Sequence, residues 1–213
     1  SRRQRQMCIR DSSMVLGEKE TVIYGKGYIE DTLCGCTFRI SPKSFYQVNP
    51  VQTEILYNKA ITYAGLTGKE KVIDAYCGTG TIGLIAASQA KEVIGVEIVE
   101  EAVTAAKENA EANGLTNCSF LAGDVLKVID EIEEKPDFIV LDPPREGIHP
   151  KALPKIVDLY RCEKMLYISC KPTSLARDLV EFAKYGYRVE KVCCVDMFPG
   201  TVHVETVCLL SRK

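Results

Sequence analysis

The sequence lacks the features of several large classes of protein. Its 27 basic and 29 acidic residues give a formal net charge of −2, so the chain as a whole has no excess positive charge to attract nucleic acid. Any binding of RNA must therefore use local patches or parts of the protein outside this sequence. No apolar run reaches the about 20 residues that span a bilayer, and no signal peptide opens the chain. We therefore expect a cytoplasmic protein that does not associate with membranes.

Paired cysteine motifs are also missing. The ten cysteines are scattered along the chain and follow neither the framework of a secreted, disulfide-linked protein nor the C-x-x-C spacing of a zinc knuckle. Cys34 with Cys36, and Cys193 with Cys194, are too close together to form such a knuckle alone. We assign no metal site and interpret most of the thiols as reduced and buried.

The composition is that of an ordinary globular domain. Hydrophobic residues make up 46% of the chain and charged residues 26%, which excludes disordered and collagen-like classes. Residues 1–12 show no periodicity and are interpreted as a cloning or assembly scar, with a disordered basic RNA-binding arm as the alternative. Residues 13–48 contain glycine-punctuated, strand-like pieces and are predicted to be a small β-rich remnant of a central region. Residues 49–213 are predicted to form the main domain.

Strand and helix patterns alternate through this main domain. Asn49 and Pro50 predict a helix start, with Asn as the N-cap and Pro in the first turn. From Lys71 onward, five strand-like runs are each followed by a helical pattern, which predicts a parallel sheet with helices on both faces. The last two strands are joined by a short turn at residues 198–200 and must pair antiparallel. We therefore predict an α/β, Rossmann-like fold with a mostly parallel seven-stranded sheet and a terminal antiparallel hairpin. This arrangement is typical of S-adenosylmethionine-dependent methyltransferases.

A glycine-rich turn follows the first strand of this sheet. Gly78 and Gly80 would let the backbone approach a ligand at a helix amino terminus. About 20 residues later, the next strand ends in Glu97, whose carboxylate can accept hydrogen bonds from a ribose diol. A solvated acidic helix start is the alternative for Glu97. An NAD site also stays open, although the third glycine of the dinucleotide fingerprint is missing.

Two further candidate positions lie at the ends of later strands. Asp142, Pro143, Pro144 and Arg145 follow the fourth strand, and the two prolines would hold Asp142 in a fixed direction. A methyltransferase for amino groups usually has an aromatic residue where Arg145 stands. The alternative is a proline-rich turn with an incidental charge.

Cys170 ends the fifth strand, at the edge of the sheet where the glycine turn is expected. Lys171 or Arg145 would lower the pKa of this thiol and favour the thiolate, which indicates a cysteine nucleophile beside a cofactor. A buried structural cysteine is the alternative. Glu205 lies in the last strand on the same face as His203 by alternation, and it would act as a base if burial raised its pKa. From the residues alone, a solvent-facing or ion-paired carboxylate is favoured for Glu205.

Together these motifs resemble the carboxyl-terminal catalytic domain of the RNA uracil-5-methyltransferase family, and they do so from about Val15 to the end of the chain. The matching stretches occur in the family's order: Ile40–Pro50 (ISPKSFYQVNP), Asp74–Gly78 (DAYCG), Asp142–Gly147 (DPPREG), Tyr167–Pro172 (YISCKP) and His203–Val207 (HVETV). The resemblance implies Cys170 as the nucleophile and Glu205 as the base. It also implies that the S-adenosylmethionine site is bound or bordered by Gln47, Tyr76, Gly78, Glu97 and Asp142.

The same resemblance implies an RNA substrate and a covalent mechanism. Cys170 would add to carbon 6 of uracil, carbon 5 would take the methyl group, and Glu205 would remove the remaining proton. Arg145 and Lys171 are expected to contact the RNA, although the family usually has Asn where Lys171 stands. The stretch from Ser169 to Asp178 is similar to the 23S ribosomal RNA branch more than to the transfer RNA branch.

Several alternatives stay open at this stage. They are a transfer RNA uracil-5-methyltransferase, a methyltransferase for exocyclic amino groups, and an inactive RNA-binding module. The family's amino-terminal RNA-binding TRAM domain and the iron-sulfur cysteines of some members are not in this sequence. We expect the chain to be a monomer.

Overall fold

The computed structural model describes residues 21–42, 44–128, 132 and 135–212. The proposed scar or arm at residues 1–12 lies outside the described residues, and so does the start of the β-rich region. The domain boundaries at residues 12 and 48 therefore stay predictions. Within the described part of the chain, no helix is long and apolar enough to cross a membrane.

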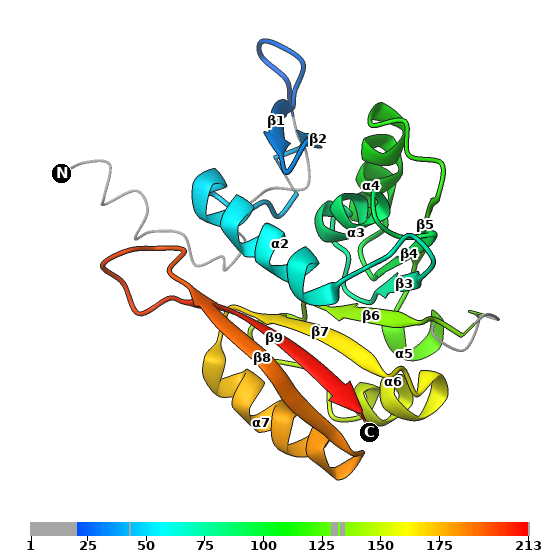
Figure 1. The fold of residues 1–213 in the computed structure, drawn as a ribbon. Coiled ribbons are helices and arrows are strands. Elements are labelled where there is room, and N and C mark those ends of the chain that lie inside the picture. The colour runs from blue at the N-terminus through cyan, green and yellow to red at the C-terminus, as the bar shows by residue number, and fades with distance from the viewer. Residues whose placement is uncertain (1–20, 43, 129–131, 133–134, 213) are drawn as a thin grey trace.

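A seven-stranded sheet forms the centre of the molecule (Figure 1). Its strands lie in the order β5-β4-β3-β6-β7-β9-β8, where the first five are mutually parallel and β9 runs antiparallel to both of its neighbours. This confirms the predicted mostly parallel sheet with a terminal antiparallel hairpin. The strands are β3 (Lys71–Asp74), β4 (Glu92–Glu97), β5 (Cys118–Ala122), β6 (Phe138–Leu141), β7 (Lys164–Ser169), β8 (Tyr187–Val195) and β9 (Glu205–Arg212).

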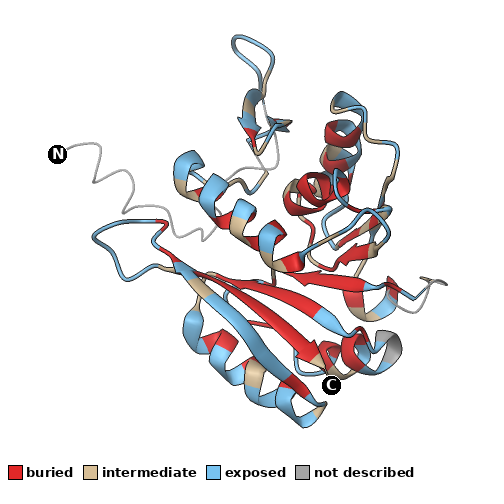
Figure 2. Cartoon of the chain, viewed as in Figure 1, coloured by how far each residue is buried: buried red, intermediate tan, exposed pale blue. Residues whose placement is uncertain are grey.

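Helices cover both faces of the sheet, as the alternating pattern predicts. One face carries α2 (Pro50–Ala64), α3 (Thr81–Ala87) and α4 (Glu100–Ala112), and the other carries α5 (Val125–Val128), α6 (Ala152–Tyr160) and α7 (Pro172–Lys184). Successive residues of β6 alternate between the two apolar cores: Phe138 and Val140 pack in one, Ile139 and Leu141 in the other. The central strands are accordingly buried along most of their length (Figure 2).

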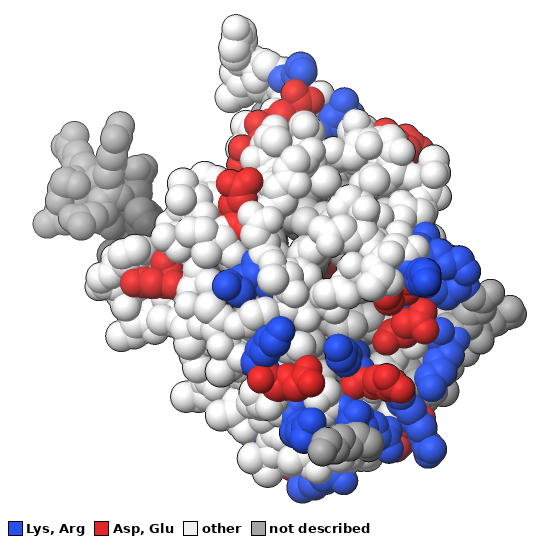
Figure 3. All heavy atoms as spheres, viewed as in Figure 1, with Lys and Arg blue, Asp and Glu red and all other residues white. Residues whose placement is uncertain are grey.

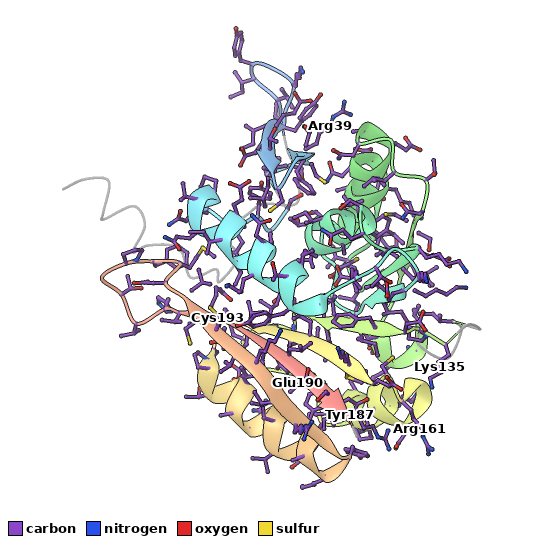
Figure 4. The ribbon with its side chains drawn as sticks, viewed as in Figure 1. Arg39, Lys135, Arg161, Tyr187, Glu190 and Cys193 are labelled. Carbon is purple, nitrogen blue, oxygen red and sulfur yellow. The ribbon has the colours of Figure 1, made fainter. Side chains whose placement is uncertain are left out.

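A two-stranded hairpin precedes the main sheet. It pairs β1 (Ile29–Leu33) antiparallel with β2 (Cys36–Ile40), and the described residues 21–28 form no strand although their sequence is strand-like. Two asparagines, Asn109 in α4 and Asn113 at its C-cap, make hydrogen bonds to the backbone of β2. Asn113 bonds both the N–H (2.8 Å) and the C=O (2.7 Å) of Thr37, and Asn109 Oδ1 accepts from the N–H of Arg39 (2.8 Å), which lies beside α4 in Figure 4. Side chains thus attach the hairpin to the main domain.

The connection between β8 and β9 is longer than the sequence suggests. It covers residues 196–204 rather than a turn at 198–200, because β9 begins only at Glu205. His203 therefore lies in an exposed loop and not in the strand. Period-two alternation fails there because the loop leaves the sheet before residue 196 and rejoins it at Glu205.

Candidate active site

The site lies at one edge of the sheet, where β3, β4, β6 and β7 end and β9 begins. Ser169 of β7 is paired with Thr206 of β9, so the next pair outward in this antiparallel register is Cys170 with Glu205. Residues opposite each other in an antiparallel pair point to the same face of the sheet. The register thus brings together the two residues predicted as nucleophile and base, although they are far apart in sequence.

The environment of Cys170 differs from the one expected from the sequence. Burial raises the pKa of the Cys170 thiol, the nearby charges of Glu205 and Asp142 raise it further, and Arg145 acts in the opposite direction. Lys171 does not offset this, because its Nζ lies 3.5 Å from Glu146 Oε1. The resting thiol is therefore protonated at neutral pH, which contradicts the expectation of an enriched thiolate. Two carboxylates and burial outweigh the one guanidinium.

Glu205 is a buried residue, with 7% of its surface exposed. Burial raises the pKa of its carboxyl group, and Arg145 partly opposes that rise. The interpretation of Glu205 as a solvent-facing carboxylate, which the residues alone favoured, is wrong because β9 enters the middle of the sheet at this position. A buried carboxyl with a raised pKa is suited to accept a proton near neutral pH.

Asp142 follows β6 and lies between the other acidic groups. Its pKa is held well above the ordinary value, first by burial and then by the charges of Glu205 and Asp74. The buried phenol of Tyr57, on α2, is influenced by the same three carboxylates. The carboxyl groups of Asp74, Asp142 and Glu205 thus lie near one another and near the phenol of Tyr57. Tyr57 was not identified from the sequence, because a helix tyrosine on an apolar face looks like any other core residue.

Arg145 is held in place by the helix that follows β7. Its backbone carbonyl accepts a hydrogen bond from Ser174 Oγ (2.8 Å), and the adjoining carbonyl of Glu146 accepts one from Arg177. Buried Asp178 then accepts from the N–H of Ile148 (2.8 Å). The loop after β6 is thus fixed by α7, and neither Ser174 nor Asp178 was identified from the sequence.

Lys171 connects the end of β7 to α7. Its N–H donates to Ser169 Oγ (3.2 Å), and Ser169 Oγ donates in turn to its carbonyl (3.1 Å). These two bonds form a tight bend around Cys170. The ion pair between the Lys171 side chain and Glu146 is partly exposed and can be exchanged for contacts with a ligand at small cost.

The glycine turn and Glu97 lie together on the other half of the edge. Glu97 Oε2 accepts from the N–H of Gly78 (3.1 Å), and Oε1 accepts from the N–H of Val99 (3.0 Å). Gly78 has a positive φ of 52°, and no heavy atom lies within 4 Å of the place where a Cβ would stand. The turn therefore leaves open space beside a half-buried carboxylate.

Asp74, at the end of β3, has a buried oxygen without a partner. Oδ2 accepts from the N–H of Gly83 (3.1 Å), while Oδ1 has no hydrogen bond to the residues that the structure describes. Burial raises the pKa of Asp74 to about 7, although the nearby backbone N–H groups of Gly83 and Tyr76 act to lower it. A donor group supplied by a ligand would satisfy this oxygen.

Tyr76 and Gln47 are less closely tied to these groups. Burial raises the pKa of Tyr76 to about 12, and the charges of Asp124 and Asp178 add to that rise. Tyr76 thus lies near Asp124, which follows β5 at the same edge and which sequence reasoning missed, although Gly123-Asp124 after a strand is a usable signal. Gln47 is half-buried in the segment before α2, and its predicted role rests on the motif alone.

Comparison with known proteins now identifies the family. The family model described as tRNA (Uracil-5-)-methyltransferase matches residues 12–213. The chain belongs to this family. An uncharacterized RNA methyltransferase of Clostridium acetobutylicum is 50% identical over 202 residues, which are 95% of this chain and 44% of that protein. Another, from Caldanaerobacter subterraneus subsp. tengcongensis, is 51% identical over 95% of this chain and 45% of its own length. The chain spans less than half the length of these curated relatives.

Solved structures agree with the family and with the fold. The Pyrococcus abyssi tRNA (uracil-54, C5)-methyltransferase, solved in complex with S-adenosyl-L-homocysteine, is 30% identical with a TM-score of 0.80, over 94% of this chain and 48% of that one. The Methanocaldococcus jannaschii Trm5 structure, solved with adenosine, is 15% identical with a TM-score of 0.64, over 89% of this chain and 58% of that one, and shows the fold alone. The predicted family is thus confirmed, while the ribosomal RNA branch stays a prediction.

Proposed function

We propose that this chain transfers a methyl group from S-adenosylmethionine to carbon 5 of a uridine in RNA. The observation that carries the proposal is the pairing of Ser169 with Thr206 across β7 and β9, which sets Cys170 beside Glu205, where the charges of Glu205, Asp142 and Arg145 act on the thiol. Carbon 5 of uracil is a poor nucleophile, and a sulfur that adds to carbon 6 makes it enolate-like. A thiol next to a buried carboxyl group is the pair that this chemistry needs.

The covalent steps balance with these two residues. The thiol of Cys170 gives its proton to water as sulfur bonds to carbon 6, and the electrons of the carbon 5–carbon 6 double bond move toward carbon 5 and oxygen 4. The proton that Glu205 takes up later in the cycle returns to the sulfur when the thiolate leaves. Carbon 5 then takes the methyl group, and S-adenosylhomocysteine leaves. Glu205 removes the proton that remains on carbon 5, the double bond forms again, and the bond between carbon 6 and sulfur breaks. The net change is one proton replaced by one methyl group.

Arg145 supports both charged stages of this reaction. Its charge lowers the pKa of the Cys170 thiol and of the Glu205 carboxyl group. A guanidinium in this position stabilises the attacking thiolate and then the negative charge on the uracil ring. Arg145 and Lys171 are proposed to contact the RNA, with Lys171 leaving its exposed ion pair with Glu146 to do so.

S-adenosylmethionine supplies an electrophilic methyl group, and the residues of the edge fit it. The carboxylate of Glu97 would accept from the ribose hydroxyls, and the open space at Gly78 admits the ligand beside it. An amino group would provide the donor that Asp74 Oδ1 lacks. Gln47, Tyr76 and Asp142 are proposed to complete the pocket.

Two classes of RNA are candidate substrates. The stretch Ser169–Asp178 supports 23S ribosomal RNA, whereas the similar P. abyssi structure is named as an enzyme for uracil 54 of tRNA. Total RNA from cells without 5-methyluridine, separated into ribosomal and transfer fractions and incubated with labelled S-adenosylmethionine, decides between them. Label in 23S rRNA at one uridine is the expected result, and label confined to tRNA would reverse the assignment.

The mechanism is tested with RNA that contains 5-fluorouridine. Fluorine cannot leave carbon 5 as a proton, so the enzyme stays attached to the methylated base. Intact-mass spectrometry should detect an adduct of protein, RNA and one methyl group, absent from Cys170→Ala. Methylation that survives in Cys170→Ala would favour an exocyclic-amino methyltransferase. Cofactor binding without any turnover, also in a protein of the relatives' full length, would favour an inactive RNA-binding module.

A further inference from the structure

The loop between β8 and β9 is fixed at its base by α2. Asn49 Nδ2 donates to the carbonyl of Met197 (3.0 Å), and Thr53 Oγ1 lies 3.7 Å from the Met197 sulfur. Met197 is fully buried. The first residues of this loop are therefore part of the core, and the position at which the loop leaves β8 is fixed.

The tip of the loop is a hydrogen-bonded turn. The carbonyl of Phe198 accepts from the N–H (3.0 Å) and from the hydroxyl (2.8 Å) of Thr201. Pro199 and Gly200 occupy the two central positions, and the φ of +87° at Gly200 is that of a type II turn. The Thr201 hydroxyl also accepts from the N–H of His203 (3.2 Å). Backbone groups and Thr201 hold this shape without the side chains of Phe198 or His203.

These two side chains are instead presented next to Arg145. The rings of Phe198 and His203 meet edge to face, with centroids 6.4 Å apart, and 36% of Phe198 is exposed. Arg145 Nη2 lies 3.3 Å from His203 Nδ1, and since a guanidinium only donates, Nδ1 accepts. A row of phenyl ring, imidazole and guanidinium thus leads from the loop tip to Cys170 and Glu205.

We propose that this row is a binding subsite for the nucleotide next to the target uridine. In it, Phe198 stacks on the neighbouring base, and His203 with Arg145 holds the phosphate between the two nucleotides. An edge-to-face contact leaves ring faces free, and exposed aromatic rings beside cations are how proteins bind single-stranded RNA. The chain has a net charge of −2, so a local group of this kind is needed to bind a polyanion. The identity of the ligand as RNA rests on the proposed function.

The charged side chains on one face of the molecule are mixed in sign. On the face shown in Figure 3, basic and acidic side chains are interspersed over α6 and the ends of β8 and β9 that are remote from this loop. Tyr187 lies at that remote end of β8 (Figure 4). Mixed charge of this kind gives an RNA backbone little net attraction.

Three variants test the subsite. Phe198→Leu keeps an apolar side chain and removes the ring, His203→Ala removes the imidazole, and Phe198→Tyr keeps a ring that can stack. Tyr24→Leu is the control, because Tyr24 is an aromatic residue with 97% exposure in the segment before β1. The probe is a short single-stranded RNA with one uridine between adenosines, used with uridine for anisotropy and with 5-fluorouridine for adduct formation. S-adenosylhomocysteine binding is measured in parallel.

Phe198→Leu and His203→Ala should each weaken RNA binding about tenfold. Cofactor affinity should stay unchanged in both variants, the rate of adduct formation at saturating RNA should stay unchanged in Phe198→Leu, and Phe198→Tyr should keep wild-type RNA affinity. Unchanged RNA affinity in both weakened variants, or equal loss in Phe198→Tyr and Phe198→Leu, would overturn the subsite. Wild-type protein that binds RNA through this loop without forming an adduct would support the subsite and contradict the proposed function. Wild-type protein that binds no RNA would contradict both.

Discussion

The two halves of the sheet edge are assembled in different ways. The half after β3 and β4 joins Gly78 to Glu97, 19 positions apart, through hydrogen bonds from backbone N–H groups to a carboxylate. The half after β6 and β7 contains Cys170, Glu205 and Asp142, which come from three separate segments. The carboxylate charges in this half shift the pKa of the neighbouring groups. The first half, which we call the cradle, is held in one geometry by these hydrogen bonds. In the second half, the pKa of a group depends on the charges of its neighbours.

This difference separates binding from chemistry. Backbone donors keep their direction whatever the protonation of nearby groups, so the cradle at Gly78 is preorganised. The charges of Glu205 and Asp142 raise the pKa of the Cys170 thiol, and the charge of Glu205 also raises the pKa of Asp142, so the loss of a proton by Glu205 changes the other two groups. Variants in one half should therefore leave the function of the other half nearly intact.

The largest effect is expected from Cys170→Ala. The variant lacks the sulfur that activates carbon 5, so methyl transfer should fall at least about 10⁴-fold, while S-adenosylhomocysteine should bind as in the wild type. Cys194→Ala is the matched control, because Cys194 is an exposed free thiol on β8. Activity is measured as transfer of labelled methyl groups to RNA. A comparable loss of cofactor binding in Cys170→Ala would show that the two halves are not separable.

Glu205→Gln should stop the reaction after methyl transfer. The amide cannot take the proton from carbon 5, so turnover should fall about 10²–10⁴-fold and a methylated covalent adduct should accumulate on ordinary uridine. Gel electrophoresis of labelled RNA under denaturing conditions measures this adduct. Glu190→Gln, at an exposed position of neighbouring β8 (Figure 4), should form none. A Glu205→Gln variant without any adduct would assign the base to another group.

In the cradle, Glu97→Ala should weaken S-adenosylhomocysteine binding about 10- to 100-fold, because it removes the acceptor proposed for the ribose and frees the N–H groups of Gly78 and Val99. Isothermal titration measures the affinity. Glu101→Ala, an exposed acid in the first turn of α4, is the control for lost negative charge. At saturating S-adenosylmethionine, adduct formation by Glu97→Ala should approach the wild-type rate, and a rate that stays low would place Glu97 in the chemical step.

The cradle is also the half that could be predicted most fully from the sequence. A strand, two glycines and an acid about 20 residues later are local patterns, and the structure brings Gly78 and Glu97 together as that spacing predicts. The burial of Glu205 could not be predicted from its neighbours, because it depends on the register of β9 against β7. The proximity of Tyr57 on α2 to the acidic groups could not be predicted from the sequence either. Nor could the direction in which the pKa of Cys170 is shifted, because it depends on which charges the tertiary fold places closest.

The last expected effect is on stability rather than on activity, and it concerns the pH dependence of Asp74, which lies beneath the cradle. Its folded-state pKa of about 7 stands above the ordinary value of 3.8, so the folded protein holds a proton that the unfolded chain releases between these values. The stability that this group contributes is complete below pH 3.8 and is lost as the pH rises through 7. Between pH 5 and 8 the loss should be about 3 kcal/mol.

Asp74→Asn removes this titration and keeps an oxygen that can accept from Gly83. Asp142 and Glu205 also have raised pKa values, so the informative quantity is the difference in Tm between variant and wild type across the pH range. The variant should gain about 6–12 °C on the wild type between pH 5 and pH 8. A difference in Tm that does not change with pH would mean that Asp74 is ionised in the folded protein throughout. The cradle would then contain a buried charge that does not titrate, and its contrast with the half of the edge whose groups exchange protons would be sharper.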